Sequence, residues 1–131
     1  MKILDVLVRK DLLIDQLEAA TGFYMRLLDA PVGLDLNLLD GQLRIVGIGR
    51  MLLVACHPQI RPSIPVAEAV YLVSGIDAFH AEVIALGGRV IVPLAEVITG
   101  RAMVVEHPDG FRVEYVEHRA SDAASGSGEH Q

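Results

Sequence analysis

The segment 111–118 carries the strongest chemical signal in the chain, a glutamate flanked by polar residues in an expected strand. Side chains alternate along a strand, so two faces follow: Phe111, Val113 and Tyr115 on one, and Arg112, Glu114, Val116 and His118 on the other. We expect the aromatic face to pack under helices. The opposite face then directs Glu114 into the space around which the sheet curls, where Arg112 can pair with its carboxylate.

Two further carboxylates belong to expected strands. Asp5 lies in the apolar segment 2–8, and Glu68 begins the segment 68–73. A carboxylate in a covered strand needs a partner, and any arginine can supply it. Carboxylates gathered in one cavity repel each other, which makes one of them a candidate general acid or base.

Composition limits the classes of protein to which the chain can belong. It has 131 residues, 52% of them hydrophobic, which fits a single globular domain. Its net charge of −6 disfavours nucleic acid as a partner. A single cysteine, Cys56, excludes an intramolecular disulfide and a thiolate zinc cluster, and predicts a cytoplasmic location. The apolar runs are too short to cross a membrane, so no membrane partner is expected.

The hydrophobic pattern predicts the same order of elements twice, a strand, a helix and three strands. The first module covers residues 1–57, and its first strand, 2–8, is apolar on both faces, as in a strand covered on both sides. Residues 58–65 hold three of the six prolines and are expected to form a linker. The second module covers 66–119. The small, polar residues 120–131 are expected to form a disordered tail.

Three segments resemble motifs of the vicinal oxygen chelate superfamily, which includes glyoxalase I, bleomycin resistance proteins and extradiol dioxygenases. These are Phe23-Tyr24 with Leu27-Leu28, then Leu86-Gly87-Gly88 with Gly100-Arg101, and His107-Pro108-Asp109-Gly110 leading to Glu114. The resemblance implies an α+β fold of two tandem βαβββ modules that form curled mixed sheets around a cavity. It also implies a homodimer.

The resemblance further implies where a metal ion would bind. Metal-dependent members place one ligand in the first strand and one in the last strand of each half. Those positions correspond here to Asp5, Glu68 and Glu114, while Leu53 or Val54 falls at the fourth and cannot coordinate a metal. Three carboxylates without imidazole suit magnesium or manganese better than zinc or nickel. None of the five histidines falls on these positions, so dioxygenase chemistry is not expected, and the cofactor is either none or a divalent metal ion.

Two functions follow as hypotheses. The first is a small-molecule-binding protein of the bleomycin resistance type, which sequesters a largely apolar ligand. Aliphatic residues such as Met51, Leu53, Met103 and Val105 would line its cavity, with Arg44, Arg50 and Arg101 as anion contacts, and the expected ligand contacts are Arg112, Leu53, Met103, Arg101 and His118. The alternative is a lyase or isomerase that binds a divalent ion through Asp5, Glu68 and Glu114, or uses Glu114 alone as an acid or base.

Overall fold

The computed structural model describes residues 1–119, so the expected disorder of 120–131 lies outside the described part of the chain. The predicted order of elements is confirmed: β1 (Lys2–Leu13), α1 (Leu17–Leu28), β2 (Val32–Leu38), β3 (Leu43–Ile48) and β4 (Met51–Cys56), then β5 (Ala69–Ser74), α2 (Ile76–Ala85), β6 (Arg89–Val97), β7 (Gly100–Glu106) and β8 (Arg112–His118). Short 3-10 helices lie at η1 (Ile14–Gln16), η2 (Leu39–Gly41) and η3 (Pro58–Ser63).

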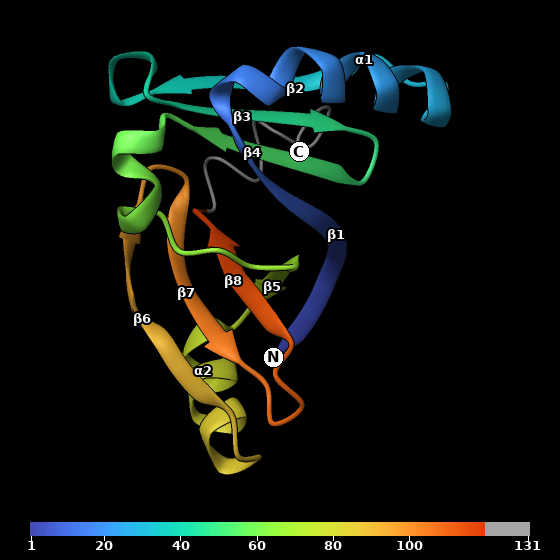
Figure 1. The fold of residues 1–131 in the computed structure, drawn as a ribbon. Helices are drawn as coiled ribbons and strands as arrows, with labels where there is room; N and C mark the ends of the chain where they lie inside the picture. Colours follow the sequence, from blue (N-terminus) through green and yellow to red (C-terminus); the bar gives the residue numbers. More distant parts are fainter. Residues whose placement is uncertain (120–131) are drawn as a thin grey trace.

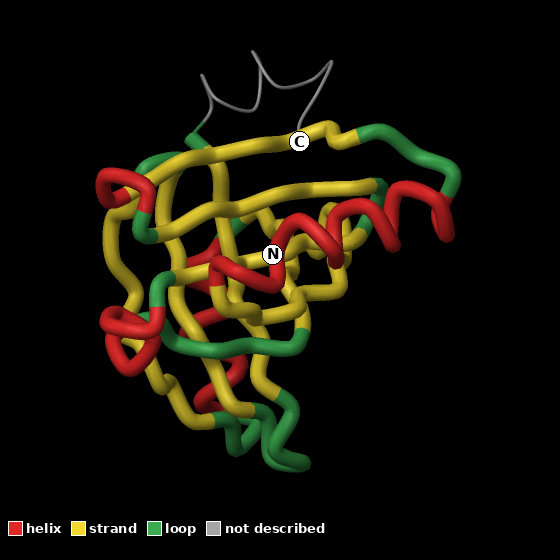
Figure 2. The backbone as a smooth tube through the Cα atoms, turned by 45° about the horizontal axis from the view of Figure 1, so that its top comes forward, coloured by secondary structure: helices red, strands yellow, loops and turns green. Residues whose placement is uncertain are grey.

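The eight strands form one mixed sheet in the order β2-β3-β4-β1-β5-β8-β7-β6. Each half contains one parallel pair, β1 with β4 and β5 with β8. The antiparallel pairing of β1 with β5 joins the halves at the centre of the sheet. Because β2 and β6 remain edges, the sheet is not a closed barrel. The strands of one half run across those of the other, which curls the sheet (Figures 1 and 2).

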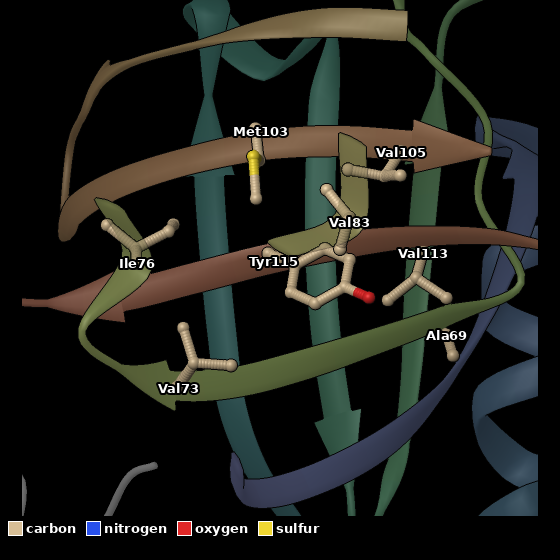
Figure 3. Packing of buried hydrophobic residues seen from close by; sticks show 8 residues of the cluster. All are labelled: Ala69, Val73, Ile76, Val83, Met103, Val105, Val113 and Tyr115. Atoms are coloured by element: carbon tan, nitrogen blue, oxygen red, sulfur yellow. The ribbon is translucent and has the colours of Figure 1, made fainter. Parts of the chain in front are cut away.

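Both helices pack on one side of the sheet, which we call the helix face. There α1 packs on β3 and β4, over buried residues that include Val46, Ile48 and Leu53. The second helix, α2, packs on β6, β7 and β8 (Figure 1). Its core contains Val113 and Tyr115, which confirms the predicted helix-packed face of β8 (Figure 3). The other side of the sheet is the cavity face.

Three elements differ from the sequence prediction. The first strand extends to Leu13 because its two halves have different neighbours: Lys2–Val8 pairs with β5, and Val8–Leu13 pairs with β4. The charged run at 9–11 therefore lies within a strand, where the pattern had indicated its end. The expected linker forms η3, with Pro58 at its first turn, where proline is tolerated. Finally, the apolar pattern predicts a strand only near residues 90–92, whereas β6 spans Arg89–Val97.

None of the helices within residues 1–119 is long and apolar enough to span a membrane.

Candidate functional site

A cavity of about 300 Å³ lies on the cavity face, between the two halves of the sheet and the segment that follows η3. Its walls are mainly aliphatic, with side chains from four strands and from the residue after η3: Leu43, Ile45, Leu52, Val54, Ile64, Val92 and Val104. Two charged residues also line it, Arg9 from β1 and Glu114 from β8. The cavity thus offers apolar surface together with one guanidinium and one carboxylate.

Arg9 holds Glu114 in place. The Arg9 side chain is only 5% exposed, and its Nη1 donates a 2.9 Å hydrogen bond to Oε1 of Glu114. Its Nη2 donates to Oδ1 of Asp11 at 2.8 Å and to the Pro65 carbonyl oxygen at 2.6 Å. The Glu114 side chain is 28% exposed, so its carboxylate is accessible from the cavity. A buried guanidinium needs such partners, and here they fix the orientation of Glu114.

Asp11 links this ion pair to the segment after η3. Its Oδ1 lies 3.6 Å from Nη2 of Arg61, and its Oδ2 accepts a hydrogen bond from the Ala67 backbone N–H. Arg61 in turn donates to the Ile64 carbonyl oxygen. Two arginines and two carboxylates therefore balance in charge along one side of the cavity. The network ties the first strand, the connecting segment and the last strand together.

The three carboxylates predicted as metal ligands lie in three separate environments. Asp5 pairs with the exposed Arg50 at 2.9 Å, and the Val6 backbone N–H, followed by Arg50, holds the pKa of the Asp5 carboxyl below its usual range. Glu68 accepts a hydrogen bond from the Arg112 backbone N–H. Glu114 alone lines the cavity. Within residues 1–119, no three His, Cys, Asp or Glu side chains are grouped as a metal site would require.

The residues present at the cavity do not fit a divalent metal ion. The charged group that β1 contributes is Arg9, a cation that donates to the one carboxylate and competes with a metal for it. From β4 the cavity receives Leu52 and Val54, which carry no donor atom. Glu114 is thus left without the further oxygen or nitrogen ligands that a divalent ion needs.

The two predicted apolar contacts, Leu53 and Met103, lie differently with respect to the cavity. Leu53 is fully buried in the core under α1, while Leu52 and Val54 face the cavity. Met103 lines the cavity and also packs with Val105 in the core under α2 (Figure 3). A strand that is apolar on both faces gives no hydropathy signal to distinguish them, because both sets of residues are buried.

The predicted polar contacts also lie elsewhere. Arg112 lies 3.9 Å from Glu106 and does not pair with Glu114 as expected. Arg101 donates two hydrogen bonds to Asp77 at the start of α2. His118 ends β8, in register with Gly100, outside the lining of the cavity.

Similarly, the other expected anion contacts have carboxylate partners: Arg44 pairs with Asp35, and Arg50 pairs with Asp5.

A larger hollow of about 530 Å³ continues the cavity face beyond Leu52, which lines both spaces. Leu7, Leu34 and Leu72 contribute to its walls, and the Asp5–Arg50 pair borders it. Gly47 leaves room there, since a Cβ at this position would lie 3.1 Å from the Cβ of Leu34.

Sequence reasoning missed Arg9 and Asp11. The available signal was their spacing: two charged residues, two positions apart, share one face of a strand that continues an apolar segment. Charges on a covered face are expected to pair with each other or with a third charge, which is what Arg9, Asp11 and Glu114 do.

No family model matches the sequence, and no curated protein matches it. Among solved structures, an uncharacterized protein from Methanosarcina mazei is 33% identical to this chain, with a TM-score of 0.75. The similarity covers 91% of this chain and 95% of that protein. This chain belongs to the family of the Methanosarcina mazei protein.

More distant structures share the fold of this family. Methylmalonyl-CoA epimerase from Mycobacterium tuberculosis is 17% identical, with a TM-score of 0.67, and the similarity covers 93% of each chain. A Streptomyces coelicolor methylmalonyl-CoA epimerase variant in complex with 2-nitronate-propionyl-CoA is 16% identical, with a TM-score of 0.65, over 91% of this chain and all of that one. This chain therefore has the fold of these epimerases, which agrees with the α+β fold of two βαβββ modules that the sequence resemblance implied.

Proposed function

We propose that this chain binds a small, largely apolar molecule in the cavity and holds it by a polar group on Glu114. The observation that carries the proposal is an aliphatic cavity with one accessible carboxylate, which a buried arginine orients. At about 300 Å³ the cavity lies at the small end of ligand pockets, so the ligand is expected to be small. The expected assembly is a cytoplasmic homodimer.

Each part of the cavity would contribute differently to binding. Removing apolar surface from water supplies roughly 25 cal/mol per Å² of ligand and wall. Glu114 accepts a hydrogen bond from an N–H or O–H of the ligand, and a hydrogen bond to a charged group contributes about 1.5–3 kcal/mol. The aliphatic walls therefore give affinity, and Glu114 selects ligands that carry a donor at one end.

A second candidate is a carboxylate-based isomerase, which the fold shared with methylmalonyl-CoA epimerases favours. Glu114 would remove a proton from the carbon next to a carbonyl group, the electron pair would move to the carbonyl oxygen as an enolate, and Glu114 would return the proton. Return of the proton to the same face would only exchange it. Because a single carboxylate lines the cavity, inversion at that carbon requires the planar enolate to turn over before Glu114 returns the proton to its other face. The test is loss of the α-proton NMR signal of methylmalonyl-CoA in D₂O, with Glu114→Gln as control.

Metal content separates the proposed function from a metal-dependent enzyme. Elemental analysis of the purified protein should find no stoichiometric metal. A thermal-shift series would add Mg²⁺, Mn²⁺, Zn²⁺ or Ni²⁺ to the wild type and to Glu114→Gln. A metal ion that binds specifically to the folded protein at Glu114 would raise the melting temperature of the wild type alone. We expect each ion to change the melting temperatures of the two proteins equally. A rise confined to the wild type would contradict the proposal.

A further inference from the structure

A single side chain separates the cavity from the larger hollow beside it. On strands β1 and β3, the hollow takes one end of the cavity face and the cavity takes the other. On β1 the change falls between Leu7 and Arg9. On β3 it falls between Ile45 and Gly47. Because Leu52 on β4 lines both spaces, the boundary between them runs through its side chain.

The strand neighbours of Leu52 leave the partition to this one residue. Gly47 on β3 and Arg9 on β1 are in register with it. Gly47 has no side chain, and a Cβ at its position would lie 3.8 Å from Cδ1 of Leu52. The Arg9 guanidinium donates to Glu114 and to Asp11, which lies farther from the hollow along β1. The half-buried side chain of Leu52 is therefore the wall between the two spaces.

The charges at the cavity favour a neutral polar group on the ligand. Nη1 of Arg9 lies 2.9 Å from Oε1 of Glu114 and balances the charge of that carboxylate. An ammonium group bound to Glu114 would lie close to this guanidinium, which would repel it. A hydroxyl group can donate a hydrogen bond to Glu114 without this repulsion.

The walls favour an aliphatic chain as the rest of the ligand. Within residues 1–119, no aromatic side chain lines the cavity, so a planar ring would find no stacking partner there. The hollow beyond Leu52 continues the same kind of surface with Leu7, Leu34 and Leu72. Since the partition is one side chain wide, an unbranched chain is the shape that could extend past its position.

We propose that the ligand is a straight-chain aliphatic alcohol whose hydroxyl group binds Glu114, and that Leu52 limits the length of its chain. The inference rests on the proposed function, since it concerns the ligand of the same cavity. A chain that extends from Glu114 buries more surface with each methylene group until it reaches Leu52, and longer chains then have no free space. Truncation of Leu52 to alanine would join the cavity of about 300 Å³ to the hollow of about 530 Å³.

A chain-length series tests the proposal. Amide NMR titrations with the straight-chain alcohols from n-butanol to n-decanol give the Kd of each alcohol for each protein. For the wild type, affinity should rise about fourfold with each methylene group and then fall within the series. For Leu52→Ala the fall should come at a longer chain, and n-decanol should bind this variant about tenfold more tightly than it binds the wild type. To the wild type, n-hexylamine should bind more weakly than n-hexanol, because Arg9 repels its ammonium group.

Two further variants keep the result unambiguous. Leu34→Ala makes the same change in the hollow alone and should keep the length limit of the wild type. Leu52→Val removes less of the partition, so it tests the same limit if Leu52→Ala does not fold, with a smaller gain in chain length.

The outcomes separate this inference from the proposed function. An equal length limit in the wild type and the Leu52 variants, or affinity for the wild type that rises up to n-decanol, would overturn the role of Leu52. Equal affinities of n-hexanol and n-hexylamine would overturn the neutral head group. If no alcohol binds while other apolar compounds stabilise the protein, this ligand class is wrong and the proposed function stands, whereas failure of both would contradict the proposed function.

Discussion

At the scale of single residues, the site depends on Arg9. Its guanidinium is buried, and it lies between two carboxylates, those of Asp11 and Glu114. An isolated buried charge is costly, so the three groups stabilise one another, and removing one leaves the others uncompensated. The mutual dependence of Arg9, Asp11 and Glu114 distinguishes this cluster from the exposed Asp5–Arg50 pair at the edge of the neighbouring hollow.

Replacing Arg9 should destabilise the protein. Arg9→Met leaves Asp11 and Glu114 without their shared cation, and we expect the free energy of unfolding to fall by about 3 kcal/mol. Urea denaturation at neutral pH measures the change. Arg50→Met is the matched control, because its ion pair is exposed and should cost less than about 1 kcal/mol. Equal losses in the two variants would mean that the Arg9 network does not stabilise the fold.

Tyr115 should make stability fall at alkaline pH. Burial, with a smaller effect of Tyr71, raises the pKa of Tyr115 from 10.0 to about 12. The unfolded chain loses this proton near pH 10 while the folded chain keeps it, so stability is full below pH 10 and declines as pH rises toward 12, by about 2 kcal/mol. Urea denaturation between pH 8 and 11.5 should show this decline in the wild type.

Tyr115→Phe removes the titrating group. The variant loses the hydrogen bond between the Tyr115 hydroxyl and Nε2 of His107, which should cost about 1 kcal/mol at neutral pH. Its stability should then decline less steeply above pH 10. An alkaline decline as steep as that of the wild type would assign the effect to other groups.

At the scale of elements, two glycines have opposite roles. Gly100 begins β7, where a Cβ would lie 2.0 Å from the Glu117 carbonyl oxygen, so Gly100→Ala should displace β8 and cost more than about 2 kcal/mol. Gly22 lies in α1 with nothing within 4 Å of its Cβ position. Gly22→Ala should raise stability by up to about 1 kcal/mol. Thermal denaturation of the two variants measures both changes in stability. Equal changes would contradict the crowded position of Gly100 and the open position of Gly22.

Strand β1 shows what the sequence could and could not predict. The order of elements followed from hydrophobic periods and turn residues, which act locally. The extension of β1 through Arg9 and Asp11 depends on pairing with β4, more than 40 residues away, and on the partner Glu114. The sequence could not predict which side of β4 faces the cavity for a related reason: Leu53 and Val54 are both buried, and only the position of α1 decides which of them faces the cavity.

At the scale of the whole molecule, the cavity exists because the two halves of the sheet meet. Its lining comes from β1, β3 and β4 on one side and from β6, β7 and β8 on the other. The repeat in the sequence predicted the two halves, and the fold resemblance predicted a cavity between them. The chemistry within it could not be carried over, because β1 contributes Arg9 to the cavity, whereas Asp5, the first-strand ligand that the resemblance implied, pairs with Arg50 outside the lining.

The central claim is that this cavity binds a small apolar molecule without a metal. The most direct measurement is a thermal-shift screen of small apolar compounds with EDTA present, run on the wild type and on two tryptophan variants. Ala95→Trp fills the cavity that Ala95 lines, and Ala81→Trp on α2 adds the same side chain to an exposed position elsewhere. The account predicts compounds that stabilise the wild type and Ala81→Trp but not Ala95→Trp. Compounds that stabilise all three proteins equally, or only when a divalent metal replaces EDTA, would contradict it.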